Sequence, residues 1–164
     1  MSDNYQSILD LRAIRDYRED PLSEEDLDAI LEAARWTGSS KNLQNWSFVV
    51  VQDETQLAKV ADYGTYTDPI RNAAATIVIV NEPTGYEFDS GRVAQNIMLA
   101  AAAIGVASCP ITLHRDRDAA DLLGLRADQS CRYAVALGYP APDAHPKKVG
   151  GRKSISELVH WEQY

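Results

Sequence analysis

The sequence predicts one globular domain in which helices cover both faces of a central β-sheet, a fold of the α/β or α+β class. Three apolar segments, residues 46–51, 76–80 and 133–137, lack the alternating polar residues of a strand with one solvated face. Strands of this kind are buried on both faces, and the helical patterns between them are typical of folds with helices on each side of a sheet. The 164 residues are the size of a single domain, residues 1–164.

Composition and charge exclude several classes of function. Lys and Arg total 16 against 24 Asp and Glu, so the net charge is −8 and the surface repels phosphate backbones and anionic lipid. We therefore expect no nucleic-acid and no membrane partner. The longest apolar run, residues 97–107, is too short to span a bilayer, and residues 1–4 lack the features of a signal peptide. Cys109 and Cys131 show no metal-ligand spacing, so we expect a reduced, cytoplasmic protein with no metal site.

The clearest helix start lies at Ser23, which can cap the helix that follows. Apolar residues from Leu27 to Ala34 then recur at helical spacing, and Gly38 suits the position just past the helix end. The polar segment 37–45 is predicted to be a loop. It leads into the strand 46–51, which is rich in β-branched residues.

The middle of the chain alternates between helix and strand. A short helix is predicted over residues 54–62, an irregular stretch over 63–72 and a buried strand over 76–80. The longest helical stretch, residues 92–104, is closed by Gly105.

The last third of the chain ends in a separate tail. A short strand at 106–108 and a helix at 116–123 precede the strand 133–137. Residues 141–151 carry three prolines and no apolar periodicity, which indicates a connector. Ser154 to Glu157 form a capping box that begins a final short helix. Its apolar residues must dock either on this chain or on a second subunit.

No side-chain machinery for catalysis is visible. The glycine-loop phosphate motifs, the metalloprotease motif and the serine-hydrolase motif are missing. His114, His145 and His160 are scattered, and Cys109 has no partner histidine in a recognisable motif. The sequence therefore predicts no catalytic residue of its own.

Positive charge is scarce, so its placement is informative. Arg12 and Arg15 follow the first helix, and Arg152 and Lys153 end the connector. A guanidinium can grip a phosphate or carboxylate with two parallel hydrogen bonds. The alternative is that Arg12 and Arg15 only form ion pairs with the nearby acids Asp10, Asp16 or Glu19.

The loop before the first strand carries hydrogen-bonding side chains at Ser39, Ser40, Asn42 and Gln44. Hydroxyl and amide groups can pair with the carbonyl and N–H groups of a planar polar ligand. The alternative interpretation is a serine/asparagine turn with Trp46 inserted in the core.

These segments together resemble the FMN-dependent nitroreductase family. Arg12 to Tyr17 and the capped helix are similar to the opening of the family, and Ser39 to Phe48 to its Pro-Ser-x-x-Asn-x-Gln-Pro-Trp-x-Phe signature. Asp89 to Asn96 resembles the start of the long central helix. Gly138-Tyr139-Pro140 and Arg152 to Ile155 match the C-terminal half. Four such matches occur in register over nearly the whole chain.

The resemblance implies an α+β fold with a mixed central β-sheet flanked by helices, in an intertwined homodimer with exchanged C-terminal tails and FMN at the subunit interface. It implies that Arg12, Arg15 and Arg152 hold the phosphate and ribityl end, and that the polar loop reaches the flavin from the other subunit. The full set of FMN-binding residues implied by the resemblance is Arg12, Ala13, Arg15, Ser39, Ser40, Asn42, Gln44, Pro110, Ile111, Thr112, Arg152 and Lys153.

The activity implied is electron transfer from NADH or NADPH through FMN to an electron-poor small molecule, a nitroaromatic, quinone or flavin, by a ping-pong mechanism. In this reaction the flavin N5 carries the chemistry and the protein supplies orientation. Three alternatives remain: a non-catalytic FMN-binding or storage protein, a specialised flavin oxidase or dehydrogenase of the same family, and an acidic interaction domain without a cofactor.

Several residues depart from the family pattern. Leu11 and Ala13 replace an arginine and a serine, which predicts weaker FMN binding. Gly38 and Asn45 replace the two prolines of the loop signature, which predicts a more flexible loop. Gly150 replaces a lysine, for which Arg71 is a candidate substitute. Residues 81–88 leave no room for the helices that roof the flavin in many members, so we expect an open active site.

Overall fold

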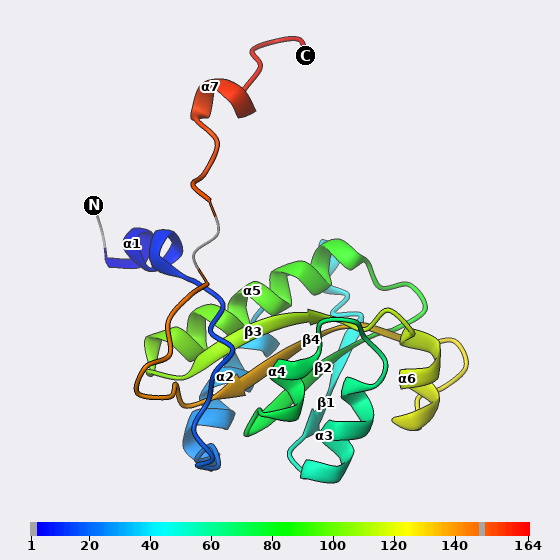
Figure 1. Cartoon of the computed structure of the whole chain (residues 1–164). Coiled ribbons are helices and arrows are strands. Elements are labelled where there is room, and N and C mark those ends of the chain that lie inside the picture. The colour runs from blue at the N-terminus through cyan, green and yellow to red at the C-terminus, as the bar shows by residue number, and fades with distance from the viewer. Residues whose placement is uncertain (1–2, 148–149) are drawn as a thin grey trace.

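The computed structural model describes residues 3–147 and 150–164, and its body is built around a four-stranded sheet (Figure 1). The strands are β1 (Trp46–Val51), β2 (Ala75–Asn81), β3 (Ala107–Thr112) and β4 (Ser130–Gly138), in the order β1-β2-β4-β3. All three strand pairs are antiparallel. The expectation of a mixed sheet is therefore wrong for the described residues, because each of these neighbouring pairs runs in opposite directions.

Helices cover both faces of this sheet (Figure 1). The helices of the described residues are α1 (Asp3–Asp10), α2 (Glu24–Arg35), the 3-10 helix η1 (Ser40–Asn42), α3 (Glu54–Ala61), α4 (Asp68–Arg71), α5 (Glu87–Ala103), α6 (Asp116–Leu122) and α7 (Ile155–Leu158). Residues of α2 and α5 contribute to the core on one face, and residues of α3, α4 and α6 to the core on the other.

The central strand β2 shows why two helical layers are needed. All of its residues are buried. Ile77 and Ile79 point into the core shared with α2 and α5, whereas Val78 and Val80 point into the core shared with α3, α4 and α6. A strand without polar alternation is thus covered on both faces, as its sequence predicts.

The local helix signals in the sequence are confirmed. The Ser23 hydroxyl oxygen accepts a hydrogen bond from the backbone N of Asp26 at 3.1 Å, which caps α2. At the start of α7, Ser154 and Glu157 form the expected reciprocal capping box. Gly105 follows α5 with a φ of 79°, a conformation that glycine adopts without a steric penalty.

Three element boundaries differ from the sequence-based prediction. Helix α5 begins at Glu87, five residues early, and its N-cap Tyr86 has no side-chain capping bond that could have signalled this start. Strand β3 continues through Pro110 to Thr112 rather than ending at residue 108. Residues 68–71, expected to be irregular, form the short helix α4, whose Pro69 and Ile70 are buried.

The C-terminal tail, residues 150–164, projects away from the body with α7 at a distance from the sheet (Figure 1). All of its residues are exposed. Two residues of the predicted connector 141–151, Lys148 and Val149, lie outside the described residues. Within the part of the chain that the structure describes, no helix combines the length and the apolar character needed to cross a bilayer.

Candidate functional site

The arginine segment, residues 12–17, lies against the start of β3. The backbone N of Ile14 donates a hydrogen bond to the carbonyl oxygen of Ser108 at 3.0 Å. The Tyr17 hydroxyl donates to the carbonyl oxygen of Ile14 at 2.9 Å. A bond to the sheet and a bond within the segment therefore fix the backbone from which its two arginines project.

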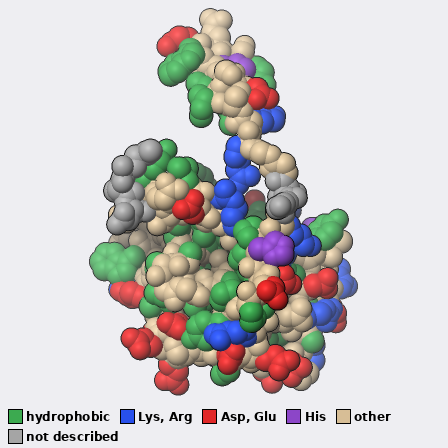
Figure 2. All heavy atoms as spheres, turned by 60° about the vertical axis from the view of Figure 1, so that its left-hand side comes forward, with side chains coloured by type: hydrophobic (Ala, Val, Ile, Leu, Met, Phe, Trp, Pro, Cys, Tyr) green, Lys and Arg blue, Asp and Glu red, His purple; other side chains and the backbone are tan. Residues whose placement is uncertain are grey.

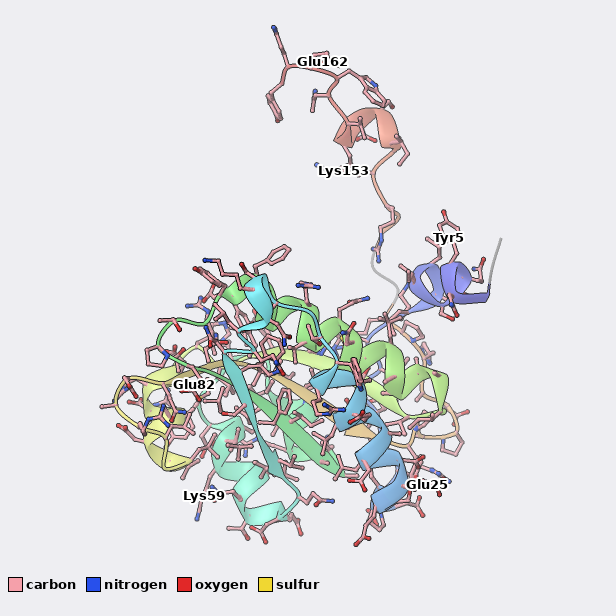
Figure 3. All side chains as sticks on the ribbon, turned by 180° about the vertical axis from the view of Figure 1, so that it is seen from behind. Tyr5, Glu25, Lys59, Glu82, Lys153 and Glu162 are labelled. Atoms are coloured by element: carbon pink, nitrogen blue, oxygen red, sulfur yellow. The ribbon has the colours of Figure 1, made fainter. Side chains whose placement is uncertain are left out.

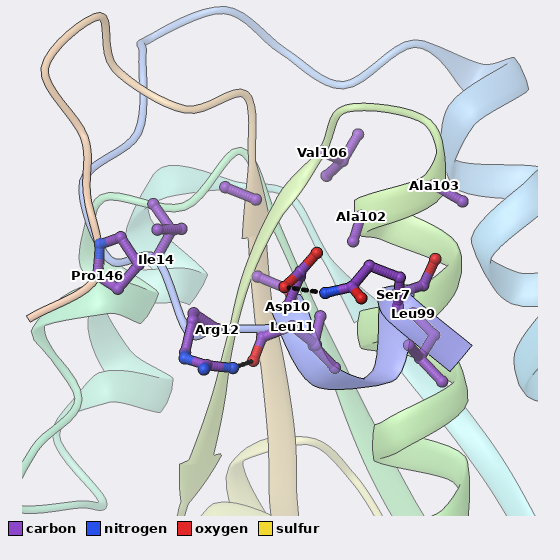
Figure 4. A pocket seen from close by; sticks show the side chains of 13 residues that line it. Ser7, Asp10, Leu11, Arg12, Ile14, Leu99, Ala102, Ala103, Val106 and Pro146 are labelled. Carbon is purple, nitrogen blue, oxygen red and sulfur yellow. Dashed lines mark hydrogen bonds between the residues drawn. The ribbon is translucent and has the colours of Figure 1, made fainter. Parts of the chain in front are cut away.

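Arg12 lies at the rim of a hollow of about 550 Å³ between α1, the C-terminal end of α5 and β3 (Figure 4). Its Nη1 donates to the carbonyl oxygens of Leu9 and Leu11, both at 2.7 Å. These contacts place the guanidinium at the C-terminal end of α1. The neighbouring Ala13 packs against the hydrophobic core, so any contact of Ala13 with a ligand would be made by its backbone.

Arg15 is half-buried beside the thiol of Cys109. Burial raises the pKa of Cys109, and the Arg15 guanidinium opposes this rise through its charge and a hydrogen bond. Because burial dominates, the thiol stays neutral at pH 7 and does not compensate the positive charge of Arg15.

Arg15 also lines a second hollow, of about 430 Å³. The other residues that line it are Asp16, Tyr66, Asp68, Pro69, Asn72 and Lys147. The positive charge of Lys147 also acts on the Cys109 thiol, so Arg15 and Lys147 both oppose the rise in the pKa of this thiol. Tyr66, Asn72 and Lys147 were not among the predicted site residues, because no motif joins the α4 region and the connector to Arg15.

The three arginines that the sequence predicts to bind FMN share one electrostatic property. Arg12, Arg15 and Arg152 form no ion pair among the described residues, whereas every other arginine there is paired with a carboxylate. The alternative that Arg12 and Arg15 serve only to neutralise nearby acids is therefore not supported. The hydrogen bonds of Arg12 and Arg15 to neutral groups leave the positive charge of both guanidinium groups without a carboxylate, so an anionic group could compensate it.

The predicted residues Pro110, Ile111 and Thr112 lie on the edge strand β3. This strand pairs with β4 on one side, and within the described chain no strand pairs with its other side. Pro110 is exposed and has no N–H to offer an incoming strand, which suits it to an edge. A groove of about 480 Å³ separates these three residues from the first half of α5.

The polar loop, residues 38–45, has an unusual backbone. Lys41, Asn42 and Gln44 all have positive φ, between 51° and 56°. For residues other than glycine this conformation costs roughly 1–2 kcal/mol each. Inside the loop, the Ser39 Oγ accepts a hydrogen bond from the backbone N of Gln44 at 2.9 Å. Strain of this kind persists only where surrounding contacts hold it, and it is concentrated at functional sites.

The side chains of the polar loop differ in how free they are. Ser40 and Asn42 are exposed, whereas Ser39 is half-buried. The Gln44 side chain donates to the carbonyl oxygen of Asn42 at 3.3 Å and faces a separate hollow between α2 and β1. The exposed hydroxyl and amide groups remain available to a ligand.

One chain does not bring the polar loop to the arginine segment. The loop and the residue before it contact Arg92 and Asn96 of α5, whereas Arg12 faces Leu99 and Ala102. Ten residues separate Arg92 from Ala102, which is about 15 Å along the helix axis. The two groups of predicted residues therefore lie at different positions along α5.

The predicted residues Arg152 and Lys153 lie in the tail. Both are exposed, and Figure 3 shows Lys153 far from the sheet, near α7. Figure 2 shows Lys and Arg side chains gathered where the tail leaves the body. Arg71, the suggested substitute for the missing lysine, points elsewhere: its Nη2 lies 2.5 Å from Asp62 Oδ1, so it is paired.

Other reactive groups do not form a second centre in the described residues. No cluster of three His, Cys, Asp or Glu side chains suited to a metal ion occurs there. His114 Nδ1 accepts a hydrogen bond from the backbone N of Thr65 at 3.2 Å, which gives this histidine a structural role.

Comparisons with known proteins point to one family. The profile of the nitroreductase family matches residues 8–83 and 64–139. A protein of Archaeoglobus fulgidus, provisionally described as an NADH dehydrogenase/NAD(P)H nitroreductase, is 32% identical over 151 residues, which cover 85% of this chain and 87% of that protein.

Solved structures agree with this match. A provisionally assigned nitroreductase from Desulfovibrio desulfuricans, solved in complex with FMN, has a TM-score of 0.87 at 26% identity, covering 100% of this chain and 99% of that one. The NADPH:FMN oxidoreductase of Vibrio harveyi, complexed with NAD+, has a TM-score of 0.87 at 26% identity, covering 99% of this chain and 78% of the other.

Proposed function

The chain belongs to the nitroreductase family, and from this membership we propose that it is an NAD(P)H-dependent oxidoreductase that uses bound FMN to reduce a small electron-poor acceptor. The observation that carries the proposal is that three arginines, Arg12, Arg15 and Arg152, have no carboxylate partner in the part of the chain that the structure describes. In a chain of net charge −8, unpaired guanidinium groups are suited to a phosphate.

The residues present fit the chemistry of FMN. A phosphate requires cations, which Arg12, Arg15, Arg152 and Lys153 offer. The flavin ring has carbonyl and N–H groups at its edge, which suit the hydroxyl and amide groups of the polar loop. The free edge of β3 at residues 110–112 offers backbone groups beside an open groove.

Bound FMN would supply two-electron chemistry at N5, which requires no acid or base from the chain. The role of the protein would then be to hold FMN and to orient the flavin ring toward its substrates. The cations would hold the phosphate, and the backbone of Pro110 to Thr112 would face the flavin ring. Hydrogen bonds from the polar loop, through Ser39, Ser40, Asn42 and Gln44, would stabilise negative charge on the ring.

We further propose a homodimer in which the tail of each subunit packs on its partner. Ile155, Leu158, Val159 and Trp161 are exposed in the single chain, with 75%, 58%, 37% and 83% of their surfaces accessible. Apolar residues on a projecting tail require a partner surface. A second copy would also supply a polar loop to the arginine segment of the first.

The short link between β2 and α5 bears on how a substrate reaches the proposed flavin site. Only residues 82–86 join these elements, so the chain has no inserted helices there to cover a flavin. We propose an open site that accepts nitroaromatics, quinones or free flavins. Such an acceptor would receive electrons after the nicotinamide has left, as in a ping-pong mechanism.

The visible absorption spectrum of the purified protein tests the proposal first. A flavin spectrum, with FMN at about one per subunit after heat release, is the expected result. Steady-state oxidation of NADH or NADPH with a quinone then tests turnover. FMN that binds without turnover would identify a storage protein instead, and a colourless protein that takes up no FMN would overturn the assignment of the site.

A further inference from the structure

Arg92, in the first half of α5, contacts the polar loop at its first residue. Its Nη1 donates a hydrogen bond to the carbonyl oxygen of Gly38 at 2.5 Å. The same guanidinium lies over the ring of Phe88, 5.8 Å from its centre, and 3.5 Å from the carboxylate of Asp89. Two neighbours on α5 thus hold the guanidinium where it meets the loop.

Gly38 is the residue that permits this approach. A Cβ atom at position 38 would lie 3.0 Å from Nη2 of Arg92, closer than ordinary van der Waals contact. Position 38 is also where the loop signature of the family carries proline. Glycine at position 38 therefore lacks the backbone restriction of a proline, and it also leaves space for the Arg92 guanidinium beside the loop.

The far end of the polar loop is held by contacts of the same kind. The Asn45 side chain donates to Thr84 Oγ1 at 2.9 Å and to the Thr84 carbonyl oxygen at 3.2 Å. The Asn45 carbonyl oxygen accepts a hydrogen bond from the backbone N of Glu82 at 3.2 Å. Asn45 stands at the second proline position of the signature, so a polar contact replaces a ring there as well.

The loop between these two ends needs such support. Three of its residues have left-handed backbone conformations, and in this shape the Gln44 backbone N donates a hydrogen bond to Ser39 Oγ. With glycine and asparagine at the proline positions, the covalent chain itself does not restrict the loop.

We infer that Arg92 is a positioning residue for the flavin site: by its bond to Gly38 it keeps the polar loop in the shape that presents Ser40 and Asn42 to FMN. This inference rests on the proposed function. The bond to Gly38 matters more than the pair with Asp89, because the charged donor lies 2.5 Å from the Gly38 carbonyl oxygen but 3.5 Å from the carboxylate of the buried Asp89, at the outer limit of a hydrogen bond.

Three substitutions separate these contacts. Arg92→Ala removes the bond to Gly38, and Arg92→Lys keeps a cation and a donor. Asp89→Asn removes only the ion pair. Arg132→Ala is the matched control, because Arg132 lies 4.0 Å from Glu87 of α5 and forms no hydrogen bond or ion pair with the loop among the described residues.

Two measurements are made on each variant. Hydrogen–deuterium exchange of residues 38–45 in the protein freed of FMN reports the loop itself, and FMN titration reports the site. In Arg92→Ala we expect exchange of the Gln44 amide to rise and the Kd for FMN to increase roughly 5- to 20-fold. Arg92→Lys should fall between this variant and the wild type, while Asp89→Asn and Arg132→Ala match the wild type.

The outcomes distinguish the role of Arg92 from the proposed function on which this role rests. If wild-type protein binds FMN and Arg92→Ala leaves both exchange and Kd unchanged, the role of Arg92 is overturned and the proposed function stands. Faster exchange with an unchanged Kd also overturns the role, because the loop shape would then be irrelevant to FMN. A wild-type protein that binds no FMN overturns the proposed function together with the role of Arg92.

Discussion

The side chain of Tyr17 lies directly against Gly138: a Cβ atom at position 138 would lie 2.8 Å from both Cβ and Cγ of Tyr17. The hydroxyl of the same tyrosine donates to the carbonyl oxygen of Ile14. Burial raises the pKa of Tyr17 well above its usual range, so the hydroxyl remains a donor at any ordinary pH. The glycine at the end of β4 therefore determines how the arginine segment lies.

Gly138→Ala should destabilise the protein and weaken FMN binding together. The added methyl group must displace the Tyr17 side chain, and overpacking of this kind costs about 1–3 kcal/mol. Because Tyr17 holds the backbone next to Arg15, the Kd for FMN should rise as well. Thermal unfolding and FMN titration measure the two effects. Gly91→Ala is the control for stability alone, since a methyl group there meets no atom within 4 Å but Gly91 lines the groove beside Pro110. Equal stability losses in both variants would contradict the prediction.

Arg15→Ala should weaken binding of FMN by about 1.5–3 kcal/mol, the loss of a charge-assisted hydrogen bond. Riboflavin lacks the phosphate, so its affinity should hardly change. Lys147→Ala should show the same selective loss to a smaller degree, because Lys147 lines the same hollow as Arg15. Titrations with FMN and with riboflavin test this prediction. Arg18→Ala is the control, because Arg18 is exposed and paired with Asp20 at 3.3 Å. Equal losses for FMN and riboflavin would remove Arg15 from the phosphate site.

The sequence predicted those parts of the fold that local chemistry determines. The uninterrupted apolar run of β2 and the capping residue Ser23 each carry their own signal. Strand β3 was predicted too short because Pro110 interrupts the apolar pattern, yet an edge strand tolerates a proline. The direction in which strands pair depends on contacts between distant segments, so no single segment could signal that all three pairs are antiparallel. The mixed sheet implied by the family resemblance was wrong for this reason.

The candidate site likewise contains residues that the sequence indicated and contacts between distant segments that it could not indicate. Residue type left Arg12 and Arg15 open between anion binding and ion pairing, and the resemblance to the family favoured anion binding; the absence of ion pairs at both among the described residues agrees with that interpretation. The approach of Lys147 to Arg15 joins residues 132 positions apart, and no motif records it. Likewise, the residues of the polar loop were predicted by type, but their support from Arg92 depends on how α5 lies beside the loop.

Cys131 should resist modification in the folded protein and make stability depend on alkaline pH. The residue is fully buried, and burial raises the pKa of its thiol to about 11 from an ordinary value of 9.0. Between these two values the unfolded thiol loses its proton while the folded one keeps it, so stability falls as the pH rises, by an amount on the order of 2 kcal/mol. Chemical unfolding at pH 8 and pH 10.5, compared with Cys131→Ala, measures this term. An equal pH dependence in both proteins would assign the effect to other groups.

Removal of the tail should separate the subunits without unfolding the body. Within the described residues, the backbone hydrogen bonds of residues 150–164 are made inside the tail itself, so a chain ending at residue 151 should retain its secondary structure. Light scattering should then report a monomer, and the Kd for FMN should rise because Arg152 is lost. The double variant Leu158→Ala and Trp161→Ala retains Arg152 and Lys153 but removes about 2–4 kcal/mol of apolar burial at each interface. If this variant also shifts toward monomer, the apolar tail residues hold the dimer. A dimer of undiminished stability in both proteins would show that the tail packs nowhere on the partner.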